Sequence, residues 1–131
     1  MKKTIYTAGK MSGLTWDESM KWRINAKNAM PNFNVYVPPF TEIGPEGKEI
    51  WSCDYYMLDH SDIVLANFCY DGDSPFIGTS MEIARAFYQR KPIIVFTDKD
   101  WVEKNITLKF HATKIVKTLE EALEYIETYY K

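Results

Sequence analysis

Two short segments that consist almost entirely of apolar residues constrain the fold of this chain most strongly. They are DIVLANF (62–68) and KPIIVFT (91–97), and a helix-length stretch separates them. A strand that is apolar on both sides must be covered on both sides, which is typical of a parallel sheet between helices. Strand-like and helix-like segments alternate around them: strands at 3–8, 33–37 and 113–117, and helices at 16–30, 48–60, 79–90 and 118–131. Residues 100–111 predict a short helix with a loop.

This alternation predicts a single α/β domain over residues 1–131, with one five-stranded parallel sheet between two layers of helices. The arrangement is that of flavodoxin-like and Rossmann-like three-layer folds, and we expect the strand order 2-1-3-4-5. Such sheets bind ligands beyond the carboxyl ends of their strands, where the strand order reverses. Three loops should therefore meet at the site, at 9–15, 69–78 and 97–105.

Composition excludes several classes of function. A net charge of -2 lacks the excess of basic residues that a general nucleic-acid binder carries. The two cysteines form no CxxC pair, and neither a Walker A loop nor a GxGxxG motif is present, so we expect no metal and no cofactor. The N-terminal residues MKKTIYTAG contain no long apolar run, which predicts neither a signal peptide nor a membrane span. We therefore expect a cytoplasmic protein.

The loop AGKMSGLT follows the first strand and precedes a helix. Gly9 and Gly13 permit close approach of a ligand to the backbone, and Lys10 supplies a positive charge. Ser12 and Thr15 add hydroxyl groups just before the helix. Loops of this kind bind phosphate through backbone N–H groups and the helix dipole. A plain turn built from two glycines explains the same residues, so both interpretations stay open.

A single carboxylate, Glu82, stands near the start of the helical stretch IGTSMEIARAF (77–87). The residues TSME match the S/T-x-x-E capping box, in which Thr79 caps the helix and Glu82 bonds back to a free N–H group. The other interpretation is chemical, because a carboxylate directly behind the 69–78 loop would face the ligand crevice. The stretch by itself does not decide between them.

Four motifs, in their order and spacing, resemble the nucleoside 2-deoxyribosyltransferase superfamily, which includes the deoxynucleoside 5′-monophosphate N-glycosidases. The motifs are KTIYTAGKMSG, DYYMLDHSDIVLANF, IGTSMEIARAFYQRKPIIVF and TLEEALEYI. The resemblance runs from residue 3 to about residue 126 and is weakest between 31 and 47. It implies an enzyme that cleaves the N-glycosidic bond of a nucleoside or nucleotide without a cofactor. It also implies a homo-oligomer with active sites shared between subunits.

The resemblance assigns roles to individual residues. Glu82, four residues after Gly78, matches the catalytic glutamate, and Tyr6 matches a tyrosine close to that carboxylate. Asp54 lies eight residues before Asp62 and would help to organise the sugar site, whereas Asp62 would open a strand. The chemistry suits this assignment, because a carboxylate beneath C1′ stabilises an oxocarbenium-like sugar or bonds to it covalently.

The chain also departs from the family pattern. Transferases carry D-x-G-T-x-x-E, whose aspartate contacts the base, and Phe76 stands in that place, where it offers stacking instead. Asp73, just upstream, is a substitute for the missing acid or a solvated turn residue. Gly78 and Thr79 would line the substrate site. Asn105 matches an asparagine that reaches into a neighbouring subunit's site, although a threonine follows where the family has methionine.

Three functions stay open at this point: a deoxyribosyltransferase, a hydrolase of nucleoside 5′-monophosphates, and a nucleotide-binding module without turnover. Family size favours the transferase, and the loop at 9–15 favours the hydrolase. The retention of Glu82, Tyr6 and Asp54 disfavours the binding module. We place the transferase slightly ahead. In each case the expected partner is a small-molecule nucleoside or nucleotide, with no role for nucleic acid or a membrane.

Overall fold

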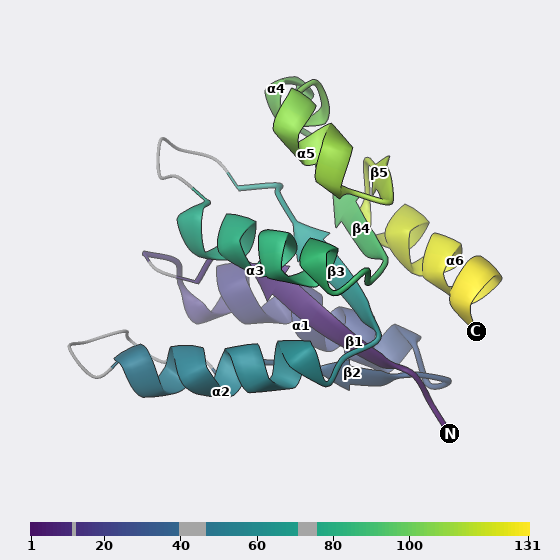
Figure 1. Cartoon of the computed structure of the whole chain (residues 1–131). Coiled ribbons are helices and arrows are strands. Elements are labelled where there is room, and N and C mark those ends of the chain that lie inside the picture. The colour runs from purple at the N-terminus through teal and green to yellow at the C-terminus, as the bar shows by residue number, and fades with distance from the viewer. Residues whose placement is uncertain (12, 40–46, 71–75) are drawn as a thin grey trace.

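Figure 1 shows a computed structural model of the chain, which describes residues 1–11, 13–39, 47–70 and 76–131. Within these residues one sheet has five strands: β1 (Thr4–Gly9), β2 (Asn34–Tyr36), β3 (Ile63–Asn67), β4 (Ile93–Phe96) and β5 (Lys114–Val116). Their order is β2-β1-β3-β4-β5, and all neighbouring strands are parallel. The predicted sheet and its order are confirmed.

Helices cover both faces of the sheet (Figure 1). They are α1 (Trp16–Ala29), α2 (Gly47–Asp59), α3 (Ile77–Tyr88), α4 (Asp100–Glu103), α5 (Ile106–His111) and α6 (Leu119–Tyr130). The predicted short helix at 100–111 is thus two helices, α4 and α5. Within the described residues, no helix is long and apolar enough to cross a membrane.

The two faces of the sheet bury different residues, because side chains along a strand alternate between faces. Ile5 of β1 belongs to a core cluster with residues of α1 and α6. Tyr6, the next residue, belongs to a second cluster with Leu58 of α2 and Ile83 of α3. This confirms the three-layer fold, and it places Tyr6 in the layer that also contains α3.

Two helices begin at the residues that the sequence suggests. Thr15 caps α1 in a full capping box with Glu18: the Glu18 N–H donates to the Thr15 hydroxyl at 3.2 Å, and the Thr15 N–H donates to the Glu18 carboxylate at 3.0 Å. Thr118 caps α6 by accepting a hydrogen bond from the Glu121 N–H at 3.1 Å. Helix α6 thus begins at the start of the predicted helical stretch 118–131.

Of the two interpretations of Glu82, the capping box with Thr79 is wrong. Helix α3 begins at Ile77, and Phe76 precedes it without a side-chain capping bond. Thr79 is therefore already helical and buried, and it is not the N-cap residue that the capping box requires. Glu82 lies more than one turn inside the helix and faces the sheet. Its presence needs another explanation, which the site provides.

Candidate active site

The centre of the candidate site is a buried pair between β1 and α3. The Tyr6 hydroxyl donates a hydrogen bond to the Glu82 carboxylate. The exposed fractions are 1% for Tyr6 and 5% for Glu82. On α3 the buried residues recur at helical spacing, as Thr79, Glu82, Ile83 and Ala86, so Glu82 lies on the stripe that packs against the sheet. The structure thus brings together two of the residues that the resemblance selected.

Burial governs the charge of this pair. The pKa of Glu82 is raised to about 7, chiefly by removal of the carboxyl group from water and also by the nearby Asp54 carboxylate. The hydrogen bond from Tyr6 and the positive charge of Arg23 act in the opposite direction. Burial and the neighbouring Glu82 also hold the pKa of Tyr6 far above its usual range. Tyr6 is therefore a permanent hydrogen-bond donor to a carboxyl group that changes its charge near neutral pH.

A second tyrosine–carboxyl pair lies beside the first. Tyr36 of β2 is opposite Tyr6 in the parallel register, and the two rings stack with centroids 5.6 Å apart and an interplanar angle of 15°. The Tyr36 hydroxyl donates to the Asp54 carboxylate at 3.3 Å. Asp54, on α2, is buried, and burial raises its pKa. Asp54 therefore lies near Glu82, as the assigned sugar-site role requires, with Tyr36 as an additional member of the site.

A buried arginine supports the carboxyl end of β1. Arg23 of α1 is 1% exposed, and its guanidinium donates to the carbonyl oxygens of Ser19, Thr7 and, at 2.9 Å, Gly9. Burial lowers the pKa of this guanidinium, while the nearby negative groups, including Glu82, raise it. Arg23 thus fixes the point where β1 passes into the 9–15 loop and places a positive charge behind the carboxyl groups.

The sequence contains a signal for both of these missed residues. Tyr36 of β2 lies opposite Tyr6 of β1, and side chains along both strands alternate between the faces of the sheet. A prediction of the register of these two strands would therefore have paired the two tyrosines. Arg23 lies on the stripe Ser19, Met20, Arg23 and Ala26, which is the buried face of α1. A charged residue on an otherwise buried stripe indicates a special role.

Glycine is required at two positions of the 9–15 loop, for different physical reasons. A Cβ on Gly9 would lie 2.9 Å from a Trp22 ring carbon and 3.2 Å from the Tyr70 hydroxyl, so a larger residue does not fit there. Gly13 has φ of +78°, a conformation that favours glycine. Lys10 is partly buried. Ser12 lies outside the described residues, and phosphate binding by this loop stays a prediction.

Phe76 lies in an aromatic cluster at the entrance to α3. Its ring centroid is 4.8 Å from that of Phe68, 6.1 Å from that of Tyr70 and 6.3 Å from that of Trp101. Phe68 and Tyr70 follow β3, and Trp101 lies in α4, so the predicted segments 69–78 and 97–105 meet here. The 9–15 loop joins them, because the Tyr70 hydroxyl lies beside Gly9. The place where transferases carry an acid is thus surrounded by rings. Asp73, the proposed substitute, lies outside the described residues.

The other predicted residues have clear positions. A Cβ on Gly78 would lie 2.5 Å from Trp51 Cη2, so this glycine allows α2 and α3 to pack closely. Asn105 caps α5, because its side-chain oxygen accepts from the Leu108 N–H at 2.9 Å. Its contribution to a neighbouring subunit stays a prediction. Asp62 accepts a hydrogen bond from the Thr4 N–H at 2.8 Å, a structural role at the start of β3.

In the part of the chain that the structure describes, no three His, Cys, Asp or Glu side chains come together in a way that could hold a metal ion. The arrangement instead offers two buried carboxyl groups, each held by a tyrosine hydroxyl, beside a glycine-containing loop. Carboxyl groups held in this way can act as a nucleophile or as a general acid or base.

Neither a protein-family model nor a curated protein sequence matches the chain. Solved structures do. The 2-desoxiribosyltransferase from Leishmania mexicana superposes with a TM-score of 0.79 at 21% identity, over 98% of this chain and 99% of that one. The 2-deoxyribosyltransferase from Bacillus psychrosaccharolyticus gives 0.73 at 16% identity, over 93% and 91%. This chain has the fold of the 2-deoxyribosyltransferases.

A CMP N-glycosidase from Clostridium botulinum also superposes, with a TM-score of 0.54 at 18% identity, over 97% of this chain and 100% of that one. Both branches of the superfamily that the motifs resemble are thus represented among the structural neighbours. The resemblance seen in the sequence holds for the fold over almost the whole chain.

Proposed function

We propose that this protein belongs to the nucleoside 2-deoxyribosyltransferase superfamily and transfers the deoxyribosyl group of a 2′-deoxynucleoside to an acceptor base, with Glu82 as the nucleophile. One observation carries the proposal: the buried Tyr6–Glu82 pair, in which burial raises the pKa of Glu82 to about 7. A carboxyl group that is buried where its charged form is disfavoured is typical of a functional site. The fold shared with 2-deoxyribosyltransferases supports the same conclusion.

The chemistry proceeds in two displacements at the sugar. The ionised Glu82 carboxylate attacks C1′, the C1′–N bond breaks, and its electron pair leaves with the base, which takes up a proton. A ring nitrogen of the second base then attacks C1′, loses its proton, and releases the carboxylate. The Tyr6 hydroxyl holds one carboxylate oxygen, which orients the other toward C1′. Asp54, fixed by Tyr36, binds hydroxyl groups of the sugar.

A second candidate function is hydrolysis of (deoxy)nucleoside 5′-monophosphates, in which water replaces the acceptor base. The specific observation in its favour is Phe76, which stands among aromatic rings where transferases have a base-binding aspartate. Lys10 and the glycine-containing loop supply features suited to a 5′-phosphate. The transferase stays ahead because both transferase structures superpose with higher TM-scores than the N-glycosidase.

The test is incubation with deoxynucleosides and with their 5′-monophosphates, each with and without a free acceptor base, followed by chromatography. A transferase forms a new nucleoside only when the acceptor is present, whereas a hydrolase releases free base without it. Glu82→Gln should abolish turnover. Glu124→Gln, which changes an exposed glutamate of α6, is the matched control and should keep it.

Two further measurements make the test decisive. Intact-mass measurement of the wild-type protein during turnover should reveal a deoxyribosyl adduct that Glu82→Gln lacks. Lys10→Ala should lower kcat/KM roughly ten- to a hundred-fold for the monophosphate only, because a hydrogen bond to a charged group is worth about 1.5–3 kcal/mol. Full activity in Glu82→Gln would refute the proposal that Glu82 is the nucleophile. If none of these substrates is turned over, the only function that remains is a nucleotide-binding module without turnover.

A further inference from the structure

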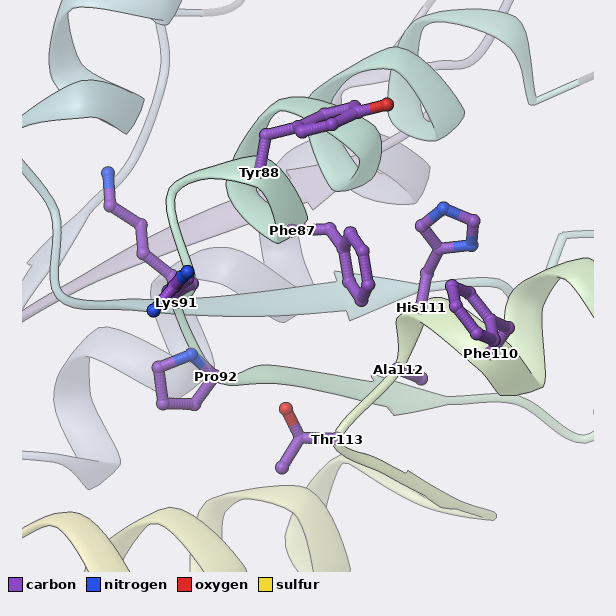
Figure 2. Close-up of a pocket in the computed structure, with 9 residues that line it drawn as sticks. Phe87, Tyr88, Lys91, Pro92, Phe110, His111, Ala112 and Thr113 are labelled. Atoms are coloured by element: carbon purple, nitrogen blue, oxygen red, sulfur yellow. The ribbon is translucent and has the colours of Figure 1, made fainter.

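A cavity lies at the other end of the sheet from Glu82. It has a volume of about 590 Å³, within the range of small-molecule sites. Pro92, just before β4, and Thr113, just before β5, form its floor, so it opens at the amino ends of these strands. Figure 2 shows the ring of Phe87, from α3, facing Phe110 and His111, from α5, above that floor. The cavity is thus separate from the candidate active site.

One residue of this cavity has a costly backbone conformation. Arg90 has φ of 60°, and no other non-glycine residue of the described chain has a positive φ. It follows the end of α3, where its N–H donates to Phe87 O at 2.9 Å and the Lys91 N–H donates to Ala86 O at 3.1 Å. These two bonds form the Schellman motif, whose left-handed position is normally glycine. The chain has arginine there instead, and such outliers often mark functional positions.

The walls of the cavity are aromatic and poorly buried. The ring of Phe87 lies 5.5 Å from that of Phe110 and 4.6 Å from that of His111, measured between centroids. Phe110 remains 71% exposed, and Tyr88, which also lines the cavity, remains 85% exposed. Core packing does not account for rings that remain this exposed. They offer flat surfaces on which a planar ligand ring can stack.

The polar groups around these rings favour an anion. Three basic residues and no acidic ones occur among the described residues that line the cavity. The Lys91 ammonium is engaged, because it donates to the carbonyl oxygens of Leu58 and Asp59. Arg90 makes no side-chain hydrogen bond or ion pair within the described structure, so its guanidinium is available. His111 Nδ1 donates to Thr107 O at 2.7 Å, which leaves Nε2 for a ligand.

The dipoles of helices α3 and α5 explain part of the positive charge at the cavity. Basic residues are favoured at helix C-termini, and both α3 and α5 end at this cavity. That effect accounts for positive charge there, but glycine or asparagine at position 90 would avoid the backbone strain, and basic residues earlier in the last turn would serve the dipole equally well. It does not account for the exposed rings of Tyr88 and Phe110. A ligand with both a ring and an anionic group accounts for all of these features.

We propose that this cavity is a second binding site, distinct from the Glu82 site, that takes a nucleoside 5′-monophosphate with its base against Tyr88, Phe87 and Phe110 and its phosphate on Arg90. The choice of a nucleotide among anionic ring compounds rests on the proposed function. The aromatic and cationic character of the cavity does not depend on it.

The test is photo-crosslinking of the full chain with 8-azidoadenosine 5′-monophosphate, followed by peptide mapping. Label is expected in peptides that contain residues 87–92 or 106–113. Arg90→Gly should raise the concentration needed for half-maximal labelling of these peptides roughly ten- to a hundred-fold, as expected for a lost charged hydrogen bond to phosphate. Glycine suits the positive φ of this position, so the variant should fold and its unfolding midpoint should rise. Phe110→Ala should weaken labelling as well.

Lys109→Ala is the matched control, because Lys109 is an exposed basic residue of α5 that does not line the cavity. It should label like the wild type. Unlabelled AMP should compete far better than adenosine or inorganic phosphate, since only AMP has both groups. Label confined to peptides of the Glu82 site, or cavity label that Arg90→Gly leaves unchanged, would overturn the proposal. Cavity labelling by a protein without glycosyl transfer or hydrolysis would instead refute the proposed function alone.

Discussion

Replacing Glu82 with glutamine should change how the stability of this protein depends on pH. Folding raises the pKa of Glu82 from 4.5 to about 7, chiefly by burial. Between these values the folded state keeps a proton that the unfolded state has released, so the free energy of unfolding falls as the pH rises. The stabilisation is complete below about pH 4.5 and is lost as the pH passes through about 7. Since one pKa unit corresponds to about 1.4 kcal/mol, the loss amounts to about 3 kcal/mol.

Urea unfolding at a series of pH values from 4 to 8.5 measures this effect directly. The Glu82→Gln variant cannot ionise at this position and should lose less stability across the interval than the wild type, by about 3 kcal/mol. Burial raises the pKa of Asp54 as well, and its contribution has the same sign but is present in both proteins. Glu124→Gln, an exposed change on α6, should reproduce the wild-type profile. Parallel profiles for the wild type and Glu82→Gln would refute the argument that Glu82 is desolvated in the folded state.

Three further predictions follow from individual contacts. Tyr6→Phe removes the hydrogen bond that lowers the pKa of Glu82, so the acid limb of the pH profile of kcat/KM should move to higher pH; an unchanged limb would exclude this role for the hydroxyl. Gly78→Ala places a Cβ 2.5 Å from Trp51 Cη2 and should cost about 1–3 kcal/mol in thermal unfolding, and Trp51→Phe in the same chain should restore part of it. Thr118→Ala removes the cap of α6 and should cost about 1 kcal/mol with turnover unchanged, so lost activity would reveal an unexpected link between this helix and the site.

The sheet was predictable from the sequence because its central strands are unusually uniform. The segments that form β3 and β4 are buried throughout, and only a strand covered on both sides combines apolar residues in this way. The start of α3 was not predictable by the same means. This helix begins at Ile77, and Gly78 in its first turn packs closely against Trp51 of α2, a contact between residues far apart in the chain. The local pattern TSME therefore suggested a cap that the tertiary structure does not use.

The candidate site was only partly predictable, for a related reason. Motif resemblance located Glu82, Tyr6 and Asp54, which the fold does bring together. Arg23 was missed because a charged residue in a helix is usually exposed, and the carbonyl groups of β1 that bind it come from another element. Local sequence thus identified the carboxyl and hydroxyl groups of the candidate site and missed the buried arginine behind them.

The pairing of β1 with β2 explains why Tyr36 belongs with the other members of the site. In the observed register Tyr36 lies opposite Tyr6, and both rings point into the layer that contains α2 and α3. A shift by one residue would turn Tyr36 to the opposite face of the sheet, leaving Asp54 without its hydroxyl donor and Tyr6 without its stacking partner. The two carboxyl groups come from different helices, and the stacked tyrosines are the rigid link between them. The geometry of the candidate site is therefore set by strand register as much as by the position of Glu82 on α3.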